Sequence, residues 1–310
     1  MIDHNPRISA VLVNWNRCEL LKEAIDSLRN QNYPNMEYIV IDNGSTDDSI
    51  NWLQSQTDII VIENSKNQGA SAARNQGIRQ AEGEYLLFLD SDAEVLTQNS
   101  LQGLIAVMEE QSNIAGAAGG IYSDREARQI WCYSPCTDWE GIFDPVASTT
   151  FLENPPALST CFSVFRRSCL EEIGGFDESF FYLFEDGDLC ERLKKRGYGF
   201  YLDPEIKVYH KYAEPGRAKQ DEIQFHYYHE QLRFYYVLKN WGLKRFLSLV
   251  RAKLAQLDAY KKQFPYLPLL NYIDIYFFRA FLLLIKFPYV RLLRKKNWLR
   301  HSQRKNAKFS

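Results

Sequence analysis

An apolar run from Tyr85 to Leu89 leads without a polar break into Asp90, Ser91 and Asp92. A strand of this composition fits the interior of a largely parallel sheet that is buried on both faces. Open α/β sheets of this kind bind their ligands at the carboxyl ends of the strands. The run therefore predicts an α/β fold with functional carboxylates at one edge of the sheet.

Asp90 and Asp92 are one residue apart, so an extended backbone would place both carboxylates on the same face. Two such groups repel each other unless a cation is near, and their hard oxygen atoms suit Mg²⁺ or Mn²⁺. A cation held by one or two carboxylates keeps coordination positions for diphosphate oxygens. The alternative is a simple helix-capping turn, because Asp and Ser both favour caps.

The run is the fourth in a regular alternation of apolar and amphipathic segments. We expect strands over 8–13, 38–41, 59–62 and 85–89, and helices over 19–30, 45–54 and 71–81. Ser45 and Asp48 resemble a capping box at the start of the second helix. Strands separated by helices predict right-handed crossovers and a parallel sheet.

Polar side chains collect where these strands end, at Asn14, Trp15, Asp42 and the Asp90 to Asp92 turn. Together they would line a crevice of nucleotide size. Arg74 lies in the first turns of the third helix, where backbone donors and the helix dipole favour a phosphate or a carboxylate. An exposed helix charge is the alternative for Arg74.

Four motifs in this order resemble the amino-terminal half of glycosyltransferase family 2. They are Val11-Leu-Val-Asn-Trp-Asn-Arg17, Ile39-Val-Ile-Asp-Asn-Gly-Ser-Thr-Asp47, Asn67-Gln-Gly-Ala-Ser-Ala-Ala-Arg-Asn-Gln-Gly77 and Leu87-Phe-Leu-Asp-Ser-Asp92. The resemblance implies a GT-A fold and sugar transfer from a nucleotide-sugar with inversion at the anomeric carbon.

The resemblance also implies roles for individual residues. Asp42 would contact the nucleobase with Trp15 beside it, and Arg74 would help to position the nucleotide. Asp92 would bind the metal, while Asp90 would face the ribose or a metal-bound water.

Three carboxylates, Glu185, Asp186 and Asp188, follow an aromatic segment over 180–184. Apolar surface and neighbouring acids raise the proton affinity of a carboxylate toward that of a useful base. The alternative is that Asp186 or Asp188 caps a helix over 189–196.

The segments Gly174-Gly-Phe-Asp177 and Phe184-Glu-Asp-Gly-Asp-Leu-Cys-Glu-Arg-Leu193 resemble the acceptor-side motif of family branches that build bacterial surface polysaccharides, including rhamnosyltransferase-like ones. The resemblance makes Asp186 the catalytic base and Glu185 a residue that binds or orients the acceptor. Asp188 is held in reserve as the base.

The segment 122–156 mixes aromatic residues with prolines, so we expect a loop-rich insertion that faces the acceptor. Short strands are expected over 199–202 and 206–209, and His210 follows the second. A single histidine in such a place is more often structural than ligating. The resemblance implies that His210 completes the metal site with Asp92. Arg217 and Ala218 stand after Gly216 where relatives have Ser, which leaves the phosphate-binding role of that loop open.

The sequence beyond residue 218 is helical, aromatic and finally basic. The apolar stretch 272–290 contains Asp274, Arg279 and Lys286, so it fits a helix lying in a membrane interface better than a span. The segment 290–310 carries eight Lys or Arg and no acid, which suits an anionic membrane. A partner subunit is the alternative, and the oligomeric state stays open.

The six cysteines form no C-x-x-C pair, and no signal-peptide pattern precedes the first strand. We therefore expect reduced thiols and a cytoplasmic protein, on the inner face of the cell membrane if the basic tail binds lipid. A zinc site at Cys132 and Cys136 has unconvincing spacing. The net charge is −2, and we expect no nucleic-acid partner.

We predict an inverting, Mg²⁺- or Mn²⁺-dependent glycosyltransferase that moves a sugar from a nucleoside-diphosphate sugar to a glycan or lipid-linked glycan acceptor, in cell-surface polysaccharide synthesis. We expect a nucleotide-sugar half over 1–95, an acceptor half over 96–218 and a helical extension over 219–310.

Three alternatives remain at this point. A sugar-phosphate nucleotidylyltransferase needs a glycine-rich loop after the first strand, and the segment from Asn14 to Arg17 has no glycine. An Asp-x-Asp phosphatase needs Thr or Val where the chain has Glu94. A non-catalytic nucleotide-sugar-binding module would bind the donor without transferring the sugar.

Overall fold

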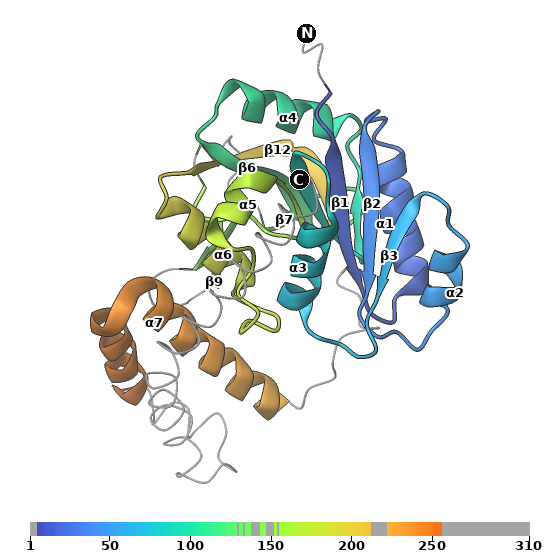
Figure 1. Cartoon of the computed structure of the whole chain (residues 1–310). Helices are drawn as coiled ribbons and strands as arrows, with labels where there is room; N and C mark the ends of the chain where they lie inside the picture. Colours follow the sequence, from blue (N-terminus) through green and yellow to red (C-terminus); the bar gives the residue numbers. More distant parts are fainter. Residues whose placement is uncertain are drawn as a thin grey trace, which may run out of the picture. The chain divides into compact units, whose positions relative to one another are not determined.

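The computed structural model describes residues 5–128, 130–132, 134–137, 143–146, 152–153, 155–211 and 222–255 (Figure 1). The chain forms two compact units. The first comprises residues 1–137 and 143–218, and the second comprises residues 138–142 and 219–310. We describe each unit by itself.

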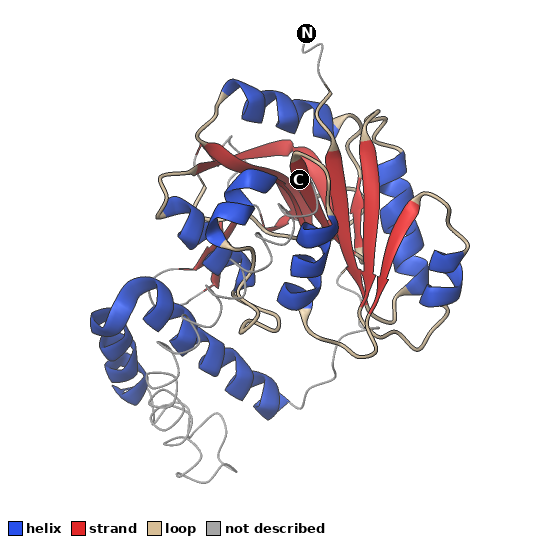
Figure 2. Cartoon of the chain, viewed as in Figure 1, coloured by secondary structure: helices blue, strands red, loops and turns tan. Residues whose placement is uncertain are grey.

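The first unit is built on a mixed sheet, which has ten strands among the described residues (Figure 2). The main strand order is β10-β12-β6-β11-β4-β1-β2-β3, with β5 paired to β12 and β7 paired to β6. The central strands are β1 (Ile8–Asn14), β2 (Met36–Asp42), β3 (Ile59–Glu63), β4 (Tyr85–Asp90), β6 (Ile114–Tyr122), β11 (Phe162–Arg166) and β12 (Gly199–His210). The shorter strands are β5 (Ala93–Val95), β7 (Ile130–Cys132), β10 (Leu152–Glu153) and the separate pair β8 (Ser134–Thr137) and β9 (Phe143–Val146).

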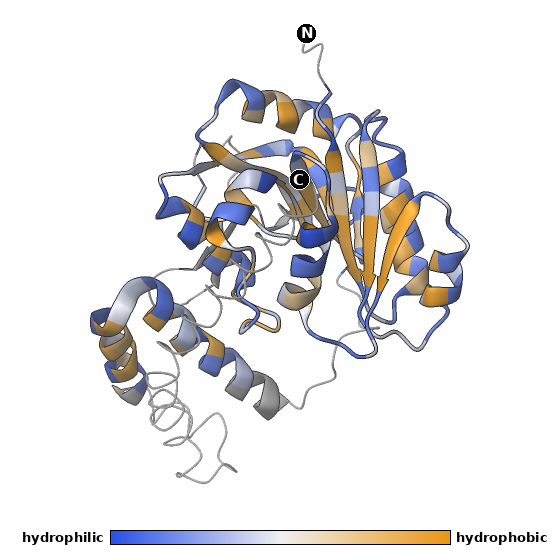
Figure 3. Cartoon of the chain, viewed as in Figure 1, coloured by the Kyte–Doolittle hydropathy of each residue, from blue (hydrophilic) through white to orange (hydrophobic). Residues whose placement is uncertain are grey.

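Helices cover both faces of this sheet. They are α1 (Cys18–Arg29), α2 (Ser49–Gln54), α3 (Ala70–Gln80), α4 (Ser100–Glu110), α5 (Arg167–Ile173) and α6 (Glu185–Lys194). Side chains alternate along β1, so Ala10 and Leu12 pack with α1 and α4, while Val11 packs with α3. Figure 3 shows the hydrophobic residues along β3 in orange. The α/β class and the mostly parallel sheet are therefore confirmed.

The strand order reverses between β1 and β4. The chain leaves β1 outward through β2 and β3 and then returns to β4 on the other side of β1, with Val13 opposite Asp90 and Asn14 opposite Asp42. Both pairings are parallel, so these residues lie at the same edge of the sheet. A reversal of this kind opens a crevice outside the strand ends. The apolar run from Tyr85 to Leu89 is buried along its whole length, as predicted.

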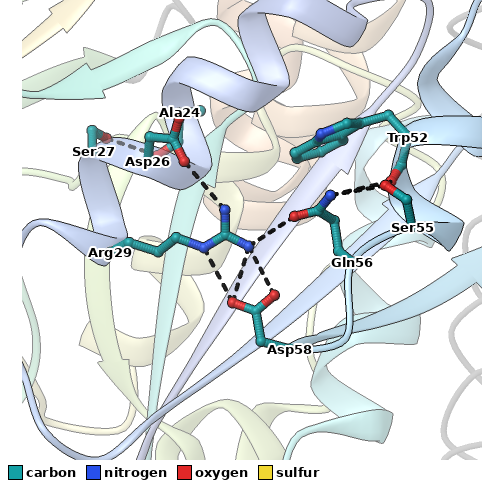
Figure 4. Close-up of polar contacts among 8 residues, drawn as sticks. All are labelled: Ala24, Asp26, Ser27, Arg29, Trp52, Ser55, Gln56 and Asp58. Carbon is teal, nitrogen blue, oxygen red and sulfur yellow. Dashed lines mark hydrogen bonds and ion pairs between the residues drawn. The ribbon is translucent and has the colours of Figure 1, made fainter.

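Arg29 fixes the corner formed by α1, α2 and β3 (Figure 4). Its guanidinium Nη2 donates to Asp58 Oδ1 at 2.8 Å and to Gln56 Oε1 at 3.1 Å, and its Nη1 lies 3.2 Å from Asp26 Oδ1. Arg29 lies in the last turn of α1, where a positive charge also complements the helix dipole. Arg29 thus ties the end of α1 to the segment between α2 and β3.

Several sequence predictions were wrong in detail. Ser45 and Asp48 form no capping box, because α2 starts at Ser49, whose backbone N–H donates to Asp47 Oδ1 at 3.1 Å. Strands predicted over 199–202 and 206–209 are the single strand β12. The segment 122–156, expected to be loop-rich, contains short strands, because β7 pairs with the end of β6 and β10 pairs with β12.

The second unit contains α7 (Glu222–Ala255), which is broken at Gly242 by a φ of 79°. Lys253 Nζ lies 3.2 Å from Glu230 Oε1, and the rings of Phe234 and Phe246 meet edge to face, so the two helical parts pack together. Among the described residues, no helix is long and apolar enough to cross a bilayer. The apolar stretch 272–290, the basic tail, the loop over 216–218 and the side chains of Cys132 and Cys136 lie outside the described residues.

Candidate active site

The carboxyl ends of β1 and β2 form the first part of the site. Asn14 Nδ2 donates to Asp42 Oδ2 at 3.1 Å and to Ser45 Oγ at 3.3 Å. The other Asp42 oxygen accepts the backbone N–H groups of Gly44 at 3.1 Å and Ser45 at 2.8 Å. Asp42 is therefore held in a fixed orientation at the base of the crevice, and Trp15 is half-buried in the turn beside it.

Asp92 and His210 are brought together by a short strand pairing. β5 pairs antiparallel with the end of β12, and the N–H of Lys211 donates to the Asp92 carbonyl at 2.9 Å. As a result, His210 Nε2 lies 3.3 Å from Asp92 Oδ1, although the two residues are far apart in sequence. Both side chains are buried. Asp92 leads into β5 and not into a helix, so the helix-capping interpretation of this turn is wrong.

Arg17 also contacts Asp92, and sequence reasoning missed it as a site residue. Arg17 Nη1 lies 3.0 Å from Asp92 Oδ1, so the same oxygen faces both a guanidinium and an imidazole. Carboxylate oxygen and imidazole nitrogen are suitable ligands for Mn²⁺, and a carboxylate also suits Mg²⁺. The Asp92 carboxylate and the His210 imidazole therefore fit a divalent cation, which would compete with the Arg17 guanidinium for the same oxygen.

Arg74 is a buried bridge between two acids. Its Nη2 lies 2.9 Å from Asp90 Oδ1, its Nη1 lies 3.0 Å from Glu185 Oε1, and its guanidinium lies over the ring of Phe176. Only 6% of Arg74 is exposed, so the alternative of a surface helix charge is wrong. The two neighbouring acids raise the pKa of Arg74, which stays charged.

Asp186 lies in the first turn of α6, beside this bridge. Thr160 holds its carboxylate with two bonds: Oγ1 donates to Asp186 Oδ1 at 2.6 Å and the N–H donates to Oδ2 at 3.2 Å. Burial, with the added charge of Glu185, raises the pKa of Asp186 to about 7, while Arg74 and Thr160 act in the opposite direction. A half-buried carboxylate with this pKa can accept a proton near neutral pH.

Asp188 has a different environment. It is fully buried, and Arg192 Nε donates to its Oδ2 at 2.8 Å. The residue at the N-cap of α6 is Phe184, so neither Asp186 nor Asp188 caps the helix and the capping interpretation is wrong. The helix begins four residues before the predicted start, which places all three acids within its first turns.

The segment that leads into α6 is pressed against the start of α3. The N–H of Ala70 donates to the carbonyl of Phe181 at 2.7 Å. Leu183 and Phe184 both have positive φ, of 69° and 65°. Such conformations cost about 1–3 kcal/mol each and are found where surrounding structure enforces them. Here they turn the chain so that Glu185 and Asp186 meet Arg74 and Thr160.

Cys161 is a further site residue that the sequence did not indicate. It is buried at the start of β11, and its carbonyl accepts the N–H of Asp90 at 3.1 Å. Burial and the carboxylates of Asp90 and Asp92 raise the pKa of its thiol well above the usual value. Thr160 and Cys161 follow no motif, because antiparallel pairing of β11 with β4 places them at the site.

The structure thus brings most of the predicted site residues to one sheet edge: Asn14, Trp15, Asp42, Arg74, Asp90, Asp92, Glu185, Asp186 and His210. Asp188 is directed into its own ion pair. A separate hollow of about 470 Å³ lies between α1 and β5, lined by residues that include Glu23, Ser27 and Glu94. It contains none of the predicted catalytic residues, and we give it no catalytic role.

The chain is similar in sequence to known glycosyltransferases. The family model "Glycosyl transferase family 2" matches residues 9–174. A GalNAc(5)-diNAcBac-PP-undecaprenol beta-1,3-glucosyltransferase of Campylobacter jejuni is 29% identical over 213 residues, which are 66% of this chain and 64% of that protein. The putative colanic acid biosynthesis glycosyl transferase WcaA of Escherichia coli is 34% identical over 147 residues, or 43% of this chain and 51% of that protein.

One solved structure is similar over nearly the whole chain. It is the mannosyltransferase PcManGT of Pyrobaculum calidifontis in complex with GDP-Man and Mn²⁺, with a TM-score of 0.55, 16% identity and coverage of 92% of this chain and 87% of that one. The fold and site define an α/β protein of the GT-A type. The chain belongs to glycosyl transferase family 2. It spans less than two thirds of the length of the curated relatives it matches.

Proposed function

We propose that this chain is an inverting, metal-dependent glycosyltransferase that moves a sugar from a nucleoside-diphosphate sugar to a glycan or lipid-linked glycan, in cell-surface polysaccharide synthesis. The observation that carries the proposal is the position of Asp186. Asp186, whose pKa is raised to about 7, directly follows Glu185, and Arg74 joins Glu185 to Asp90. Asp90 stands two residues before Asp92, which faces His210. The names of the Campylobacter jejuni and Escherichia coli relatives support this class of acceptor.

The donor nucleotide would lie at the ends of β1 and β2. Asp42 presents a fixed carboxylate there, and the buried Oδ1 of Asn14 has no hydrogen-bond partner within the described residues. The Asp42 carboxylate and the Asn14 Oδ1 atom are both hydrogen-bond acceptors, which suit the N–H groups of a nucleobase. Trp15 would lie beside the base, and Asp90 would face the ribose or a metal-bound water.

Asp92 and His210 would hold Mn²⁺ or Mg²⁺. Such an ion, when bound, supplies positive charge that offsets the charge on the departing nucleoside diphosphate. Asp186 would take the proton of an acceptor hydroxyl that approaches the anomeric carbon opposite the leaving group. The proton moves to the Asp186 carboxylate, the new glycosidic bond forms and the bond to phosphate breaks in one displacement, which inverts the anomeric carbon.

Glu185 would orient the acceptor, because Arg74 holds its carboxylate beside the base. Thr160 would keep the Asp186 carboxylate aimed at the acceptor, since it binds both oxygens. Arg74 would keep Asp90 and Glu185 in place with one buried positive charge. No covalent nucleophile is required. Asp188 is left out, because Arg192 engages it.

The helical extension would bring the enzyme to the membrane. α7 exposes Trp241, Leu243 and Leu247, with exposed fractions of 39%, 54% and 46%, and Lys244 lies among them. Apolar and aromatic side chains next to basic ones favour the surface of an anionic bilayer. Replacing Leu243 and Leu247 with Glu should reduce sedimentation with anionic vesicles, and unchanged sedimentation would remove α7 from this role.

The test of the proposed function combines binding and transfer. Thermal shift with UDP, GDP and dTDP, each with and without Mn²⁺, should identify a nucleotide that stabilises the protein only with metal. Asp186→Asn should abolish transfer from the matching nucleotide-sugar to membrane lipid extracts while keeping this shift. Glu191→Gln also replaces a carboxylate of α6 with the corresponding amide, and this control variant should retain transfer. Normal turnover in Asp186→Asn, or no shift with any nucleotide, would overturn the proposal.

A further inference from the structure

Three potential metal ligands of different chemistry converge at the site. They are the carboxylate of Asp90, the thiol of Cys161 and the imidazole of His210, and one ligand atom from each lies within 4.8 Å of the others. They come from the ends of β4 and β12 and from the residue before β11. The proposed function uses Asp90 and His210 but gives Cys161 no task.

Backbone pairing holds this cluster in place. The N–H of Asp90 donates to the carbonyl of Cys161 at 3.1 Å, and the next residues continue this contact as the antiparallel pair Leu89 and Phe162. His210 is held by its pairing with Ala93. The donors therefore sit on a rigid sheet, and little ordering is needed for them to bind an ion.

The three side chains of the cluster differ in their exposure to solvent. Cys161 is 3% exposed and His210 is 7% exposed, while the Asp90 side chain is 31% exposed. A small ion would enter past Asp90 and reach a thiol and an imidazole that are shielded from bulk water. Tetrahedral zinc sites have bond lengths of about 2.0–2.3 Å, so their ligand atoms are about 3.5 Å apart. The ligand atoms thus need to move by about 1 Å to close on an ion.

Ligand softness then decides which ion is preferred. Oxygen ligands suit Mg²⁺ and Mn²⁺, whereas a set of thiolate, imidazole and carboxylate suits Zn²⁺ or Cd²⁺. We propose that Asp90, Cys161 and His210 form a binding site for a thiophilic divalent cation, Zn²⁺ in the first place. On binding, the sulfur–metal bond forms, the thiol proton leaves to solvent, and no oxidation takes place.

The consequence for the enzyme rests on the proposed function. His210 would be shared between this site and the Mn²⁺ or Mg²⁺ site that we assign to Asp92, so both cannot be complete at once. Zn²⁺ would therefore inhibit transfer, and excess Mn²⁺ would relieve the inhibition. Cys161 would make transfer by this chain sensitive to inhibition by Zn²⁺, and an apolar residue at the same place would not.

The binding test uses the full chain and Cd²⁺ alone, without donor or acceptor. Titration of the unsubstituted protein should give an ultraviolet thiolate-to-cadmium charge-transfer band that saturates. Cys161→Ser should lower its amplitude by one thiolate, and Asp90→Asn should weaken binding at least tenfold with every cysteine in place. Cys169→Ser, which removes another buried thiol, should change neither.

Each outcome decides the proposal. A band that persists unchanged in Cys161→Ser, or no band in the unsubstituted protein, would overturn it. If Cys161→Ser does not fold, a Cd²⁺ affinity in Asp90→Asn equal to that of the unsubstituted protein would overturn it instead. Because this measurement contains no donor, it succeeds or fails independently of the transfer assay. In that assay, the Zn²⁺ concentration for half-inhibition should rise at least tenfold in Cys161→Ser.

Discussion

Arg74 Nη1 lies 3.0 Å from Glu185 Oε1, although 111 positions separate the two residues in the chain. Arg74 comes from the helix that follows the third strand, and Glu185 is the first residue of α6. Because Arg74 also contacts Asp90 at 2.9 Å, one guanidinium joins the acceptor-side acids to the carboxylates at the end of β4. The positions of Glu185, beside the proposed base Asp186, and of Asp90, two residues before the proposed metal ligand Asp92, therefore depend on each other.

Replacing Arg74 with Ala should damage both stability and transfer. The change leaves Asp90 and Glu185 without their buried cation, and loss of one partner from a buried ion pair typically costs about 3–5 kcal/mol. We expect the free energy of unfolding in urea to fall by about this amount. Arg79→Ala, on the same helix, should cost about 1 kcal/mol or less. Equal losses in both variants would contradict the bridging role of Arg74.

The pH dependence of transfer should reflect Asp186. A base must be ionised, so kcat/KM should fall as pH drops below about 7, the raised pKa of Asp186. Because this pKa lies above the ordinary value of 3.8, the folded state keeps a proton that the unfolded state loses. Stability should therefore decline as pH rises from 3.8 to about 7, and Asp186→Asn should flatten that decline. Chemical denaturation across this range measures the effect.

Thr160→Val should move the acidic limb of the rate profile to higher pH. The Thr160 hydroxyl stabilises the ionised carboxylate of Asp186, so its removal raises the pKa of the base further. Thr160→Ser keeps the hydroxyl and should keep the profile of the unsubstituted enzyme. A profile of kcat/KM against pH that is the same in the Val and Ser variants would argue against this contact.

Arg17→Gln should bind Mn²⁺ about tenfold more tightly than the unsubstituted protein when no nucleotide is present. The guanidinium of Arg17 contacts the Asp92 oxygen that we assign to the metal, so it repels an incoming cation. Electron paramagnetic resonance of free Mn²⁺ gives the affinity. Arg29→Gln, at the far corner of the sheet, serves as the matched control. An unchanged affinity in Arg17→Gln would show that Asp92 is not the ligand.

Gly69→Ala should be destabilising by about 1–3 kcal/mol, and it should lower transfer. Gly69 has a φ of 88°, and an added methyl group would lie 2.7 Å from the carbonyl oxygen of Phe181. The clash would push back the segment that positions Glu185 and Asp186. Gly103→Ala, in α4, meets no atom within 4 Å and should stabilise by up to about 1 kcal/mol. Thermal unfolding of the two variants should therefore shift in opposite directions.

The donor side of the site was largely predictable, because it is built from elements that the hydrophobic pattern of short segments specifies. Alternating apolar runs and amphipathic helices specify β1 to β4, and parallel strands place Asn14, Asp42 and Asp90 at one edge. The boundaries of individual strands and helices were predicted less accurately. The two strands expected before His210 are one strand, because pairing with β6 continues across a register shift between Asp203 and Lys207.

Other features were set by contacts between distant segments. Thr160 and Cys161 belong to no motif, and they reach the site because β11 runs antiparallel to β4. Arg17 reaches Asp92 from the loop after β1, and no periodicity predicts a pairing of that kind. Arg74 was expected to face a phosphate or a carboxylate, and the tertiary structure places it between two carboxylates from distant segments.

The amino-acid sequence by itself determined the α/β class, the family and the carboxylates available for chemistry, since periodicity and residue type are properties of short segments. Only the tertiary structure decided what each carboxylate does. Asp186 receives Thr160 and acquires a raised pKa, whereas Asp188, two residues later, is neutralised by Arg192. The physical reason is that proton affinity depends on burial and on charges contributed by other elements, which the linear order of residues does not specify.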